Sequence, residues 1–230
     1  MILLFIGILL GIGCIRFKES LPAEKRSKTG VWATFRSFGI IVHNRRYMLY
    51  VFQLAFAQGI LFAYIASSPF IIQQHYGFSP FAFSICFAVN AVAIGVAAAL
   101  SVKFRRTENG TLTGCVGMLV FAVLQMAALY SGCGFWTYEL LMFALLFMMG
   151  LTFTASTTLA MDCERRYAGA ASALLGALCF ASGGIVSPLV GLGDILISTG
   201  VTFVICAVCS LLCALWAVKR TGPKVALCRI

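Results

Sequence analysis

Charged residues are scarce in this sequence. Only 10% of its 230 residues are Asp, Glu, Lys or Arg, whereas 61% are hydrophobic and the mean hydropathy is +1.00. A water-soluble domain typically has about 25% charged and about 45–50% apolar residues. A chain of this length has too much surface for its volume to hide so much apolar area in a soluble core. The composition therefore excludes a soluble globular domain and indicates a protein whose apolar surface faces lipid.

Residues that carry catalysis or bind metals are also few. The chain has two histidines, His43 and His75, and neither stands at the spacing of a metal-ligand pair. Most of the ten cysteines lie inside apolar stretches, and no Cys-x-x-Cys pair is followed by a histidine or a second pair. No group of residues has the pattern of a catalytic constellation. The sequence thus predicts neither an enzyme nor a site for a metal or another cofactor.

The positive charges are confined to a few segments. The chain has 17 Lys and Arg against 7 Asp and Glu, a net charge of +10, but they form no continuous stripe that would indicate a nucleic-acid partner. Segment 16–46 carries eight of them, 103–106 three, 165–166 two and 219–230 four. The positive-inside rule places these four segments in the cytoplasm. We therefore expect the carboxyl terminus to be cytoplasmic and the amino terminus to face outside.

Seven apolar stretches alternate with the polar segments. They run over residues 1–15, 47–72, 80–102, 111–131, 135–158, 168–192 and 198–218. A spanning helix needs about 20 apolar residues, and the last six stretches have them. The first rises only about 22 Å at 1.5 Å per residue, so we interpret residues 1–15 as a short span or the end of a truncated transmembrane helix. The expected fold is an all-α polytopic membrane helix bundle with seven spans.

The basic linker 16–46 has a pattern of its own. Four apolar residues recur in it at helical spacing, namely Val31, Phe35, Phe38 and Val42. This predicts an amphipathic helix, either at the cytoplasmic membrane interface or packed on the protein's own cytoplasmic face. Residues 47–218 are then a six-helix transmembrane unit, and 219–230 are a basic cytoplasmic tail.

Three parts of the sequence have a recognisable order of residues. They are Glu19-Ser-Leu-Pro22; Tyr64-Ile-Ala-Ser-Ser-Pro-Phe-Ile-Ile-Gln-Gln-His-Tyr-Gly77 leading into Phe81–Asn90; and Ala168-Gly-Ala-Ala-Ser-Ala-Leu-Leu-Gly176 continuing to Ser187-Pro-Leu-Val-Gly191. They resemble, in that order, the element after the sixth helix, the seventh and eighth helices, and the eleventh helix of the Bcr/CflA group of drug:proton antiporters in the major facilitator superfamily. The resemblance covers residues 1–220.

The resemblance implies an architecture and a function. Such transporters have twelve helices in two halves, and the seven spans here resemble helices 6–12, the carboxy-terminal half with the end of one preceding helix. The motifs of the amino half have no counterpart in this sequence. We therefore expect part of a secondary active transporter that exports drugs or other small amphipathic molecules by proton antiport across a bacterial inner membrane. Its expected partners are the substrate, protons, lipid and either a missing amino-terminal half or a second copy.

Polar groups inside lipid are costly and mark candidate sites. Gln53 and Tyr64 share one helix face, since eleven residues make nearly three turns, and Asn90 lies midway along the next stretch. In the resembled family the matching helices line the central cavity, which makes Gln53, Tyr64 and Asn90 candidate substrate contacts. The alternative is hydrogen bonding that only holds helices together.

Glu139 is the only carboxylate close to an apolar stretch. It is a candidate proton-coupling residue, or else a solvated group at the outer end of its span. Trp136 and Tyr138 beside it have the character of interfacial anchors.

Glycines are concentrated in the stretch 168–192. We expect Gly176, Gly183, Gly184 and Pro188 to govern helix packing there, because small residues let helices approach closely and proline kinks a helix. In a transporter such a helix can also bend.

Two alternatives to a transporter remain open. Seven helices with this orientation also describe seven-helix receptors, although the stretch 198–218 lacks the lysine that a retinal Schiff base needs. The short first span also fits a non-functional fragment of a transporter gene.

Overall fold

The computed structural model describes residues 2–16, 38–104 and 106–219, without the side chains of residues 2, 3, 14 and 15. The chain divides into two units, Met1–Phe35 and Arg36–Ile230. Helix α1 (Ile2–Arg16) is the described part of the first unit. It is apolar, but its 15 residues make it shorter than a usual spanning helix. The interpretation of residues 1–15 as a short span or the end of a truncated transmembrane helix stays a prediction.

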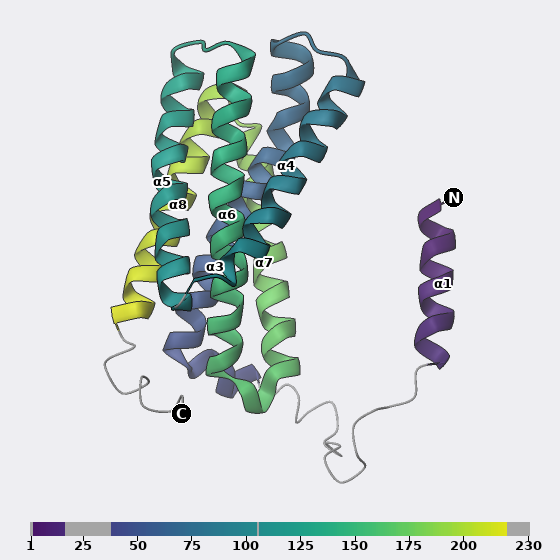
Figure 1. The fold of residues 1–230 in the computed structure, drawn as a ribbon, viewed down its shortest axis with the longest axis vertical. Coiled ribbons are helices and arrows are strands. Elements are labelled where there is room, and N and C mark those ends of the chain that lie inside the picture. Colours follow the sequence, from purple (N-terminus) through teal and green to yellow (C-terminus); the bar gives the residue numbers. More distant parts are fainter. Residues whose placement is uncertain (1, 17–37, 105, 220–230) are drawn as a thin grey trace. The chain divides into compact units, whose positions relative to one another are not determined.

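Six long helices make up the second unit (Figure 1). They are α3 (Arg45–Pro69), α4 (Pro80–Ser101), α5 (Thr107–Tyr130), α6 (Phe135–Cys163), α7 (Ala168–Val190) and α8 (Ile195–Lys219). A π-helical segment, η2 (Phe70–His75), extends α3, and a short 3₁₀ helix, η3 (Arg165–Tyr167), joins α6 to α7. Within the described ranges, these six are the helices that have the length and composition to cross a membrane. The expected all-α membrane helix bundle is confirmed.

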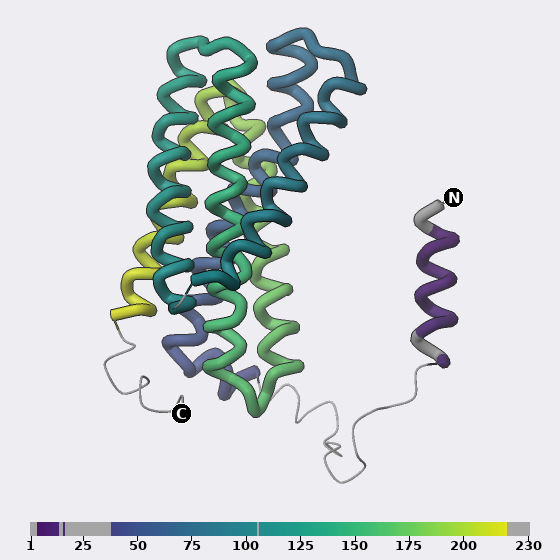
Figure 2. Tube along the Cα trace, in the orientation of Figure 1, coloured from purple at the N-terminus to yellow at the C-terminus, as the bar shows by residue number. Residues whose placement is uncertain are grey.

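Local sequence explains where several helices begin and where the chain turns. Three side chains accept hydrogen bonds from backbone N–H groups in the first turns of α3, α4 and α8, namely Asn44, Ser79 and Asp194. Three glycines with positive φ lie in the turns that lead into α4, α6 and α8, namely Gly77, Gly132 and Gly193. A residue with a Cβ is strained in that conformation. Consecutive helices therefore run in opposite directions, as the trace shows (Figure 2).

Helix α3 is at the centre of the bundle. It packs against α6, α7 and α8, while α5 packs against α6 and α8, and α4 packs mainly against α6. The main apolar core lies among these helices and includes Tyr64, Met118, Met142 and Phe203. Because α4 and α7 each lean on the bundle along one side only, much of their apolar surface is exposed.

A second apolar cluster lies where α3 begins. It includes Ile41, Tyr47 and Ala171, and the Tyr47 hydroxyl donates a hydrogen bond of 2.6 Å to the Ala171 carbonyl. Ile41 belongs to the helical residues 38–43, which are the described part of the amphipathic helix expected in the linker. Its side chain is fully buried on the bundle, whereas Val42 is exposed. Val31 and Phe35 lie outside the described residues, so the rest of that prediction stays untested.

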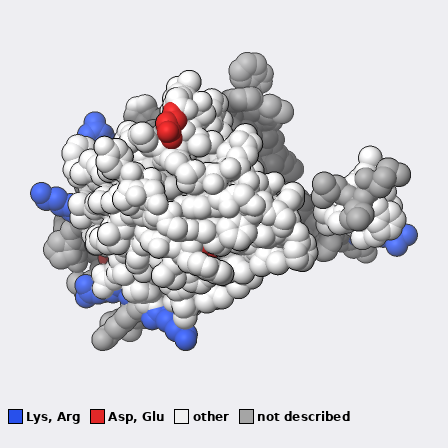
Figure 3. Space-filling view, turned by 90° about the horizontal axis from the view of Figure 1, so that it is seen from above, with Lys and Arg blue, Asp and Glu red and all other residues white. Residues whose placement is uncertain are grey.

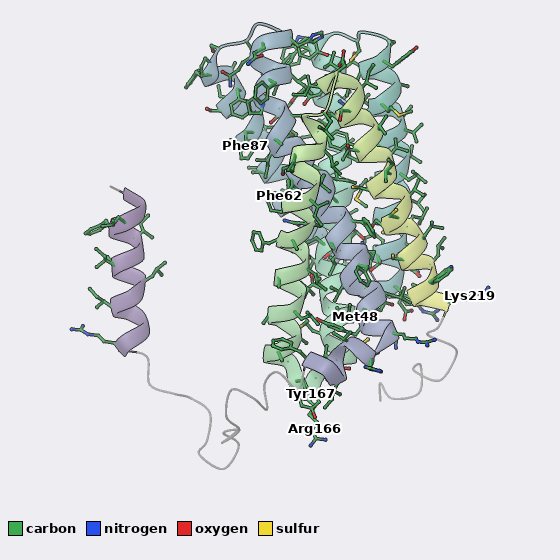
Figure 4. All side chains as sticks on the ribbon, turned by 180° about the vertical axis from the view of Figure 1, so that it is seen from behind. Met48, Phe62, Phe87, Arg166, Tyr167 and Lys219 are labelled. Carbon is green, nitrogen blue, oxygen red and sulfur yellow. The ribbon has the colours of Figure 1, made fainter. Side chains whose placement is uncertain are left out.

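The two ends of the bundle differ in charge. One end, called the basic end here, carries Arg45, Arg46, Lys103, Arg106, Arg165, Arg166 and Lys219. In Figure 4 the labelled Arg166 and Tyr167 lie at the tip of that end, and Lys219 lies at the same end of the bundle on another helix. The opposite end, seen in Figure 3, has a mostly uncharged surface with one acidic patch, and Lys and Arg atoms appear only along the outline of this view. This separation of charge matches the alternation of basic and non-basic loops in the sequence.

Candidate functional site

Three of the residues singled out from the sequence lie together inside the bundle. The Asn90 side-chain amide donates a hydrogen bond of 3.1 Å to the Tyr64 hydroxyl and one of 2.8 Å to Glu139 Oε1. Tyr64 comes from α3, Asn90 from α4 and Glu139 from α6. Tyr64 and Asn90 are buried and Glu139 is partly buried. We call these three residues the Asn90 cluster.

The Asn90 cluster has unused hydrogen-bonding capacity. Asn90 Oδ1 and Glu139 Oε2 are buried and have no hydrogen-bond partner among the described residues. The same holds for the hydroxyls of Tyr138, the neighbour of Glu139, and of Ser67, which lies one turn beyond Tyr64 on α3. Buried polar atoms in folded proteins nearly always have a partner. These buried polar atoms without partners are therefore suited to bind water or a ligand.

Aromatic rings form one wall of the cluster. The Tyr64 ring stacks on Phe87, with 5.8 Å between ring centroids and 11° between planes. The Tyr138 ring packs on Tyr76, again with centroids 5.8 Å apart. Phe87 is 37% exposed, so the stacked pair reaches the surface of the bundle. Figure 4 shows it far from the basic end. A few polar groups beside aromatic surface are typical of small-molecule sites.

Gln53 lies apart from this cluster. Its amide nitrogen is 3.2 Å from Ser210 Oγ, 3.3 Å from Thr152 Oγ1 and 3.5 Å from Cys115 Sγ. These contacts join α3 to α8, α6 and α5, and all four side chains are buried. Gln53 is eleven residues from Tyr64, about 16 Å along the helix. Its predicted role as a substrate contact remains a prediction, and the geometry favours the alternative of a hydrogen-bonded packing centre.

The glycine-rich helix α7 presents its small residues on different faces. A Cβ on Gly183 would overlap the ring of Phe62 on α3. Gly176 and Gly184 have no atom within 4 Å of the place where a Cβ would be. Pro188 is exposed in the last turn of α7. Within the described chain, Gly183 is thus the one of these glycines at a close helix contact.

The sequence interpretation missed two residues of the site. Trp136 is 80% exposed, as expected for an interfacial anchor, but Tyr138 is fully buried beside Glu139. The signal was available, since Tyr138, Met142 and Leu145 recur at the spacing of one helix face. Phe87 had no comparable signal, because its partner Tyr64 lies on another helix.

A separate cavity opens at the end opposite the basic end. Its volume is about 690 Å³, and its lining includes Ala66 from α3, Phe70, Gln74 and His75 from η2, and Ser187 from α7. It contains none of the three cluster residues. Nearby, burial raises the pKa of Tyr76, whose hydroxyl donates a hydrogen bond of 2.9 Å to the Cys133 carbonyl.

Metal ligands do not come together in the described part of the chain. No group of three or more His, Cys, Asp or Glu is placed there to hold a metal ion, and the described cysteines are free thiols.

The fold and the site together define a class of protein. Six helices with the dimensions of membrane spans enclose a polar cluster drawn from three of them, which is the architecture of a polytopic membrane transport protein. The sequence matches the profile of the Major Facilitator Superfamily over residues 1–188, and the chain belongs to that family. This is a family of transport proteins rather than of enzymes.

A relative with a curated sequence supports the assignment. The chain is 35% identical over 198 residues to the "Uncharacterized MFS-type transporter YdgK" of Bacillus subtilis (strain 168). The match covers 84% of this chain and 49% of the relative. The chain therefore spans about half the length of the curated relative that it matches.

Proposed function

We propose that this chain forms the carboxy-terminal half of a Bcr/CflA-type secondary transporter, which exports small amphipathic molecules in exchange for protons. The observation that carries the proposal is the Asn90 cluster, in which a carboxylate, an amide and a phenol from three helices are hydrogen-bonded inside the bundle. Polar and ionisable groups at this depth in a membrane protein mark substrate paths and proton relays.

Glu139 differs from the other described carboxylates. The others have the following partners: Glu108 lies 3.7 Å from Arg46, Asp162 accepts from Arg165 at 2.8 Å, Glu164 accepts from Asn44 at 2.6 Å, and Asp194 caps α8. Glu139, like Glu164, accepts a hydrogen bond from a neutral amide, but among the described carboxylates it is the one with a buried oxygen, Oε2, that has no hydrogen-bond partner. Because Asn90 occupies Oε1, Oε2 is the oxygen that remains open to a proton. We therefore assign the coupling proton to Glu139.

Transport by alternating access requires two halves that rock about a shared site. Here α4 and α7 have exposed apolar faces, and the match covers 49% of the relative. We propose that an amino-half chain or a second copy of this chain completes the transporter in a bacterial inner membrane. Purification in mild detergent from the native membrane is expected to recover this 24.8 kDa chain with such a partner. Transport by the isolated chain would contradict the need for a partner, and absence of stable protein would favour a gene fragment.

The proton-coupling assignment is tested in everted membrane vesicles from the native host with an imposed pH gradient. Addition of a transported compound is expected to dissipate the gradient in vesicles with the wild-type chain. Glu139→Gln should abolish this proton movement, because a neutral amide, unlike a carboxyl group, does not take up and release a proton in the accessible pH range. Glu108→Gln is the matched control, since it removes one carboxylate at the basic end and should leave proton movement intact. Proton movement that persists in Glu139→Gln would refute the assignment.

A further inference from the structure

The polar atoms without partners at the Asn90 cluster include two oxygens that accept hydrogen bonds and cannot donate them while Glu139 is ionised. Asn90 Oδ1 and Glu139 Oε2 are hydrogen-bond acceptors, and the Tyr138 hydroxyl can also accept. The amide nitrogen of Asn90, the strong donor of the cluster, is already engaged by Tyr64 and Glu139. A ligand that satisfies this site must therefore donate hydrogen bonds.

The charges around the Asn90 cluster also favour a ligand that donates hydrogen bonds over an anionic one. The titratable side chains that interact with Glu139 are Tyr64 on α3, Cys86 on α4 and Tyr138 on α6, and none of them is a base. The described Lys and Arg of the bundle lie at the basic end, and the first basic residue after Asn90 is Lys103, which follows the end of α4, thirteen residues or about 20 Å further along. His75, at the opposite end, packs against Tyr76 rather than against Glu139. No described cation is placed to bind an anionic ligand here.

The aromatic wall suits the same ligand. The rings of Tyr64 and Phe87 stack on each other, and the Asn90 amide links Tyr64 to the Glu139 carboxylate by donating a hydrogen bond to each. Phe87 is partly exposed. An ammonium group is attracted both by a carboxylate and by aromatic faces. The apolar body of an amphipathic molecule can cover the exposed part of Phe87.

We propose that the Asn90 cluster binds the protonated amine of an amphipathic organic cation, with the N–H groups donating to Glu139 Oε2 and Asn90 Oδ1. This deepens the proposed function, on which it rests, by naming the substrate class. The amine and the coupling proton then compete for the same carboxylate oxygen. Binding of one displaces the other, which is the minimum requirement for exchange at a single site.

The test uses three aromatic probes of similar size and different charge. These are the 9-aminoacridine cation, neutral 9-anthracenemethanol and the 9-anthracenecarboxylate anion, titrated into purified protein and followed by fluorescence polarisation. We expect the cation to bind at least about tenfold more tightly than the anion, since charge-assisted hydrogen bonds are stronger than neutral ones. Glu139→Gln should remove this preference, while Glu108→Gln should retain it. Phe87→Ala should weaken the binding of the cation and of the neutral probe to a similar degree.

The outcomes separate this inference from the proposed function. Equal or tighter binding of the anion to the wild-type protein would overturn the inference, and this comparison needs no variant to fold. An unchanged preference for the cation in a folded Glu139→Gln protein would also overturn it. If proton movement depends on Glu139 but the cation binds no more tightly than the other probes, the proposed proton exchange is supported and the proposed substrate class is wrong. Selective binding of the cation without proton movement would support the site and refute antiport.

Discussion

At the scale of single residues, two buried amides have different surroundings. Asn90 lies beside a carboxylate and aromatic rings, whereas Gln53 contacts only hydroxyl and thiol groups on three other helices. Gln53 Oε1 is buried without a partner, as Asn90 Oδ1 is, but the described hydrogen bonds of the Gln53 amide nitrogen join four helices and reach no carboxylate, so we expect Gln53 to contribute mainly to packing. The sequence offered the two residues as equivalent candidates, because both are neutral amides within apolar stretches. Their neighbours on other helices distinguish them.

Gln53→Leu is therefore expected to reduce stability without affecting ligand binding. Hydrogen bonds between membrane helices are worth about 0.6 kcal/mol on average and up to about 1.7 kcal/mol. Because several partners of Gln53 lose a bond at once, we expect a loss of about 1–2 kcal/mol. Thermal unfolding of the detergent-purified protein measures this, with the exposed Gln74→Leu as a control. Loss of 9-aminoacridine binding in a stable Gln53→Leu protein would instead make Gln53 a substrate contact.

At the scale of elements, the contact between α4 and α6 determines the geometry of the Asn90 cluster. Gly150 on α6 lies against α4, where an added Cβ would come within 2.6 Å of the Ile94 carbonyl oxygen and 2.9 Å of Ala97 Cβ. Such a distance to backbone atoms requires the helices to move apart. The hydrogen bond between Asn90 and Glu139 crosses the same interface.

Gly150→Ala is expected to destabilise the protein and to weaken cation binding together. Overpacking of a tight contact costs about 1–3 kcal/mol. Gly95→Ala on α4 is the matched control, because no atom lies within 4 Å of its added Cβ. It should leave both properties unchanged or raise stability slightly, since alanine favours helix over glycine. Thermal unfolding and 9-aminoacridine titration measure the two effects, and intact binding in Gly150→Ala would show that the cluster tolerates movement of α4.

The sequence predicted the existence of the long helices better than the positions of their ends. Apolar stretches predicted the spanning helices because burial in lipid and helix length follow from composition. They predicted the ends of the helices less accurately. Helix α6 continues past residue 158 to Cys163, and α8 begins at Ile195 rather than 198 because Asp194 caps it. Hydropathy contains no signal for the π-helical turns of η2 after Pro69.

The candidate site was predictable only in part. The family resemblance made Gln53, Tyr64 and Asn90 candidate substrate contacts, and the structure brings Tyr64 and Asn90 within hydrogen-bonding distance of each other. For Glu139 the sequence left solvation and coupling open, since its partner lies 49 residues away on another helix. Which side chains meet across helices depends on tilt and rotation, and periodicity within one helix does not specify these.

At the scale of the whole molecule, the separation of charge decides which way the site faces. The basic end carries the described Lys and Arg of the bundle, and the positive-inside rule assigns that end to the cytoplasm. Glu139 is the fifth residue of α6, about 6 Å along the helix from Phe135 at the opposite end. In this proposed orientation Glu139 lies nearer to the outer surface, the side from which protons re-enter in the proposed antiport.

Reporter fusions test this orientation directly. Green fluorescent protein fused after Lys219 should fluoresce, because that helix end lies in the cytoplasm, whereas alkaline phosphatase fused there should be inactive. Phosphatase fused after Gly77 or Gly193, in turns at the opposite end, should be active because these turns face outside. Replacing Lys103 and Arg106 by Gln is expected to lower the fidelity of insertion, since these charges hold the loop between α4 and α5 inside. The reverse activity pattern would place Glu139 near the cytoplasm, and exchange at the Asn90 cluster would then draw its protons from the wrong side of the membrane for export.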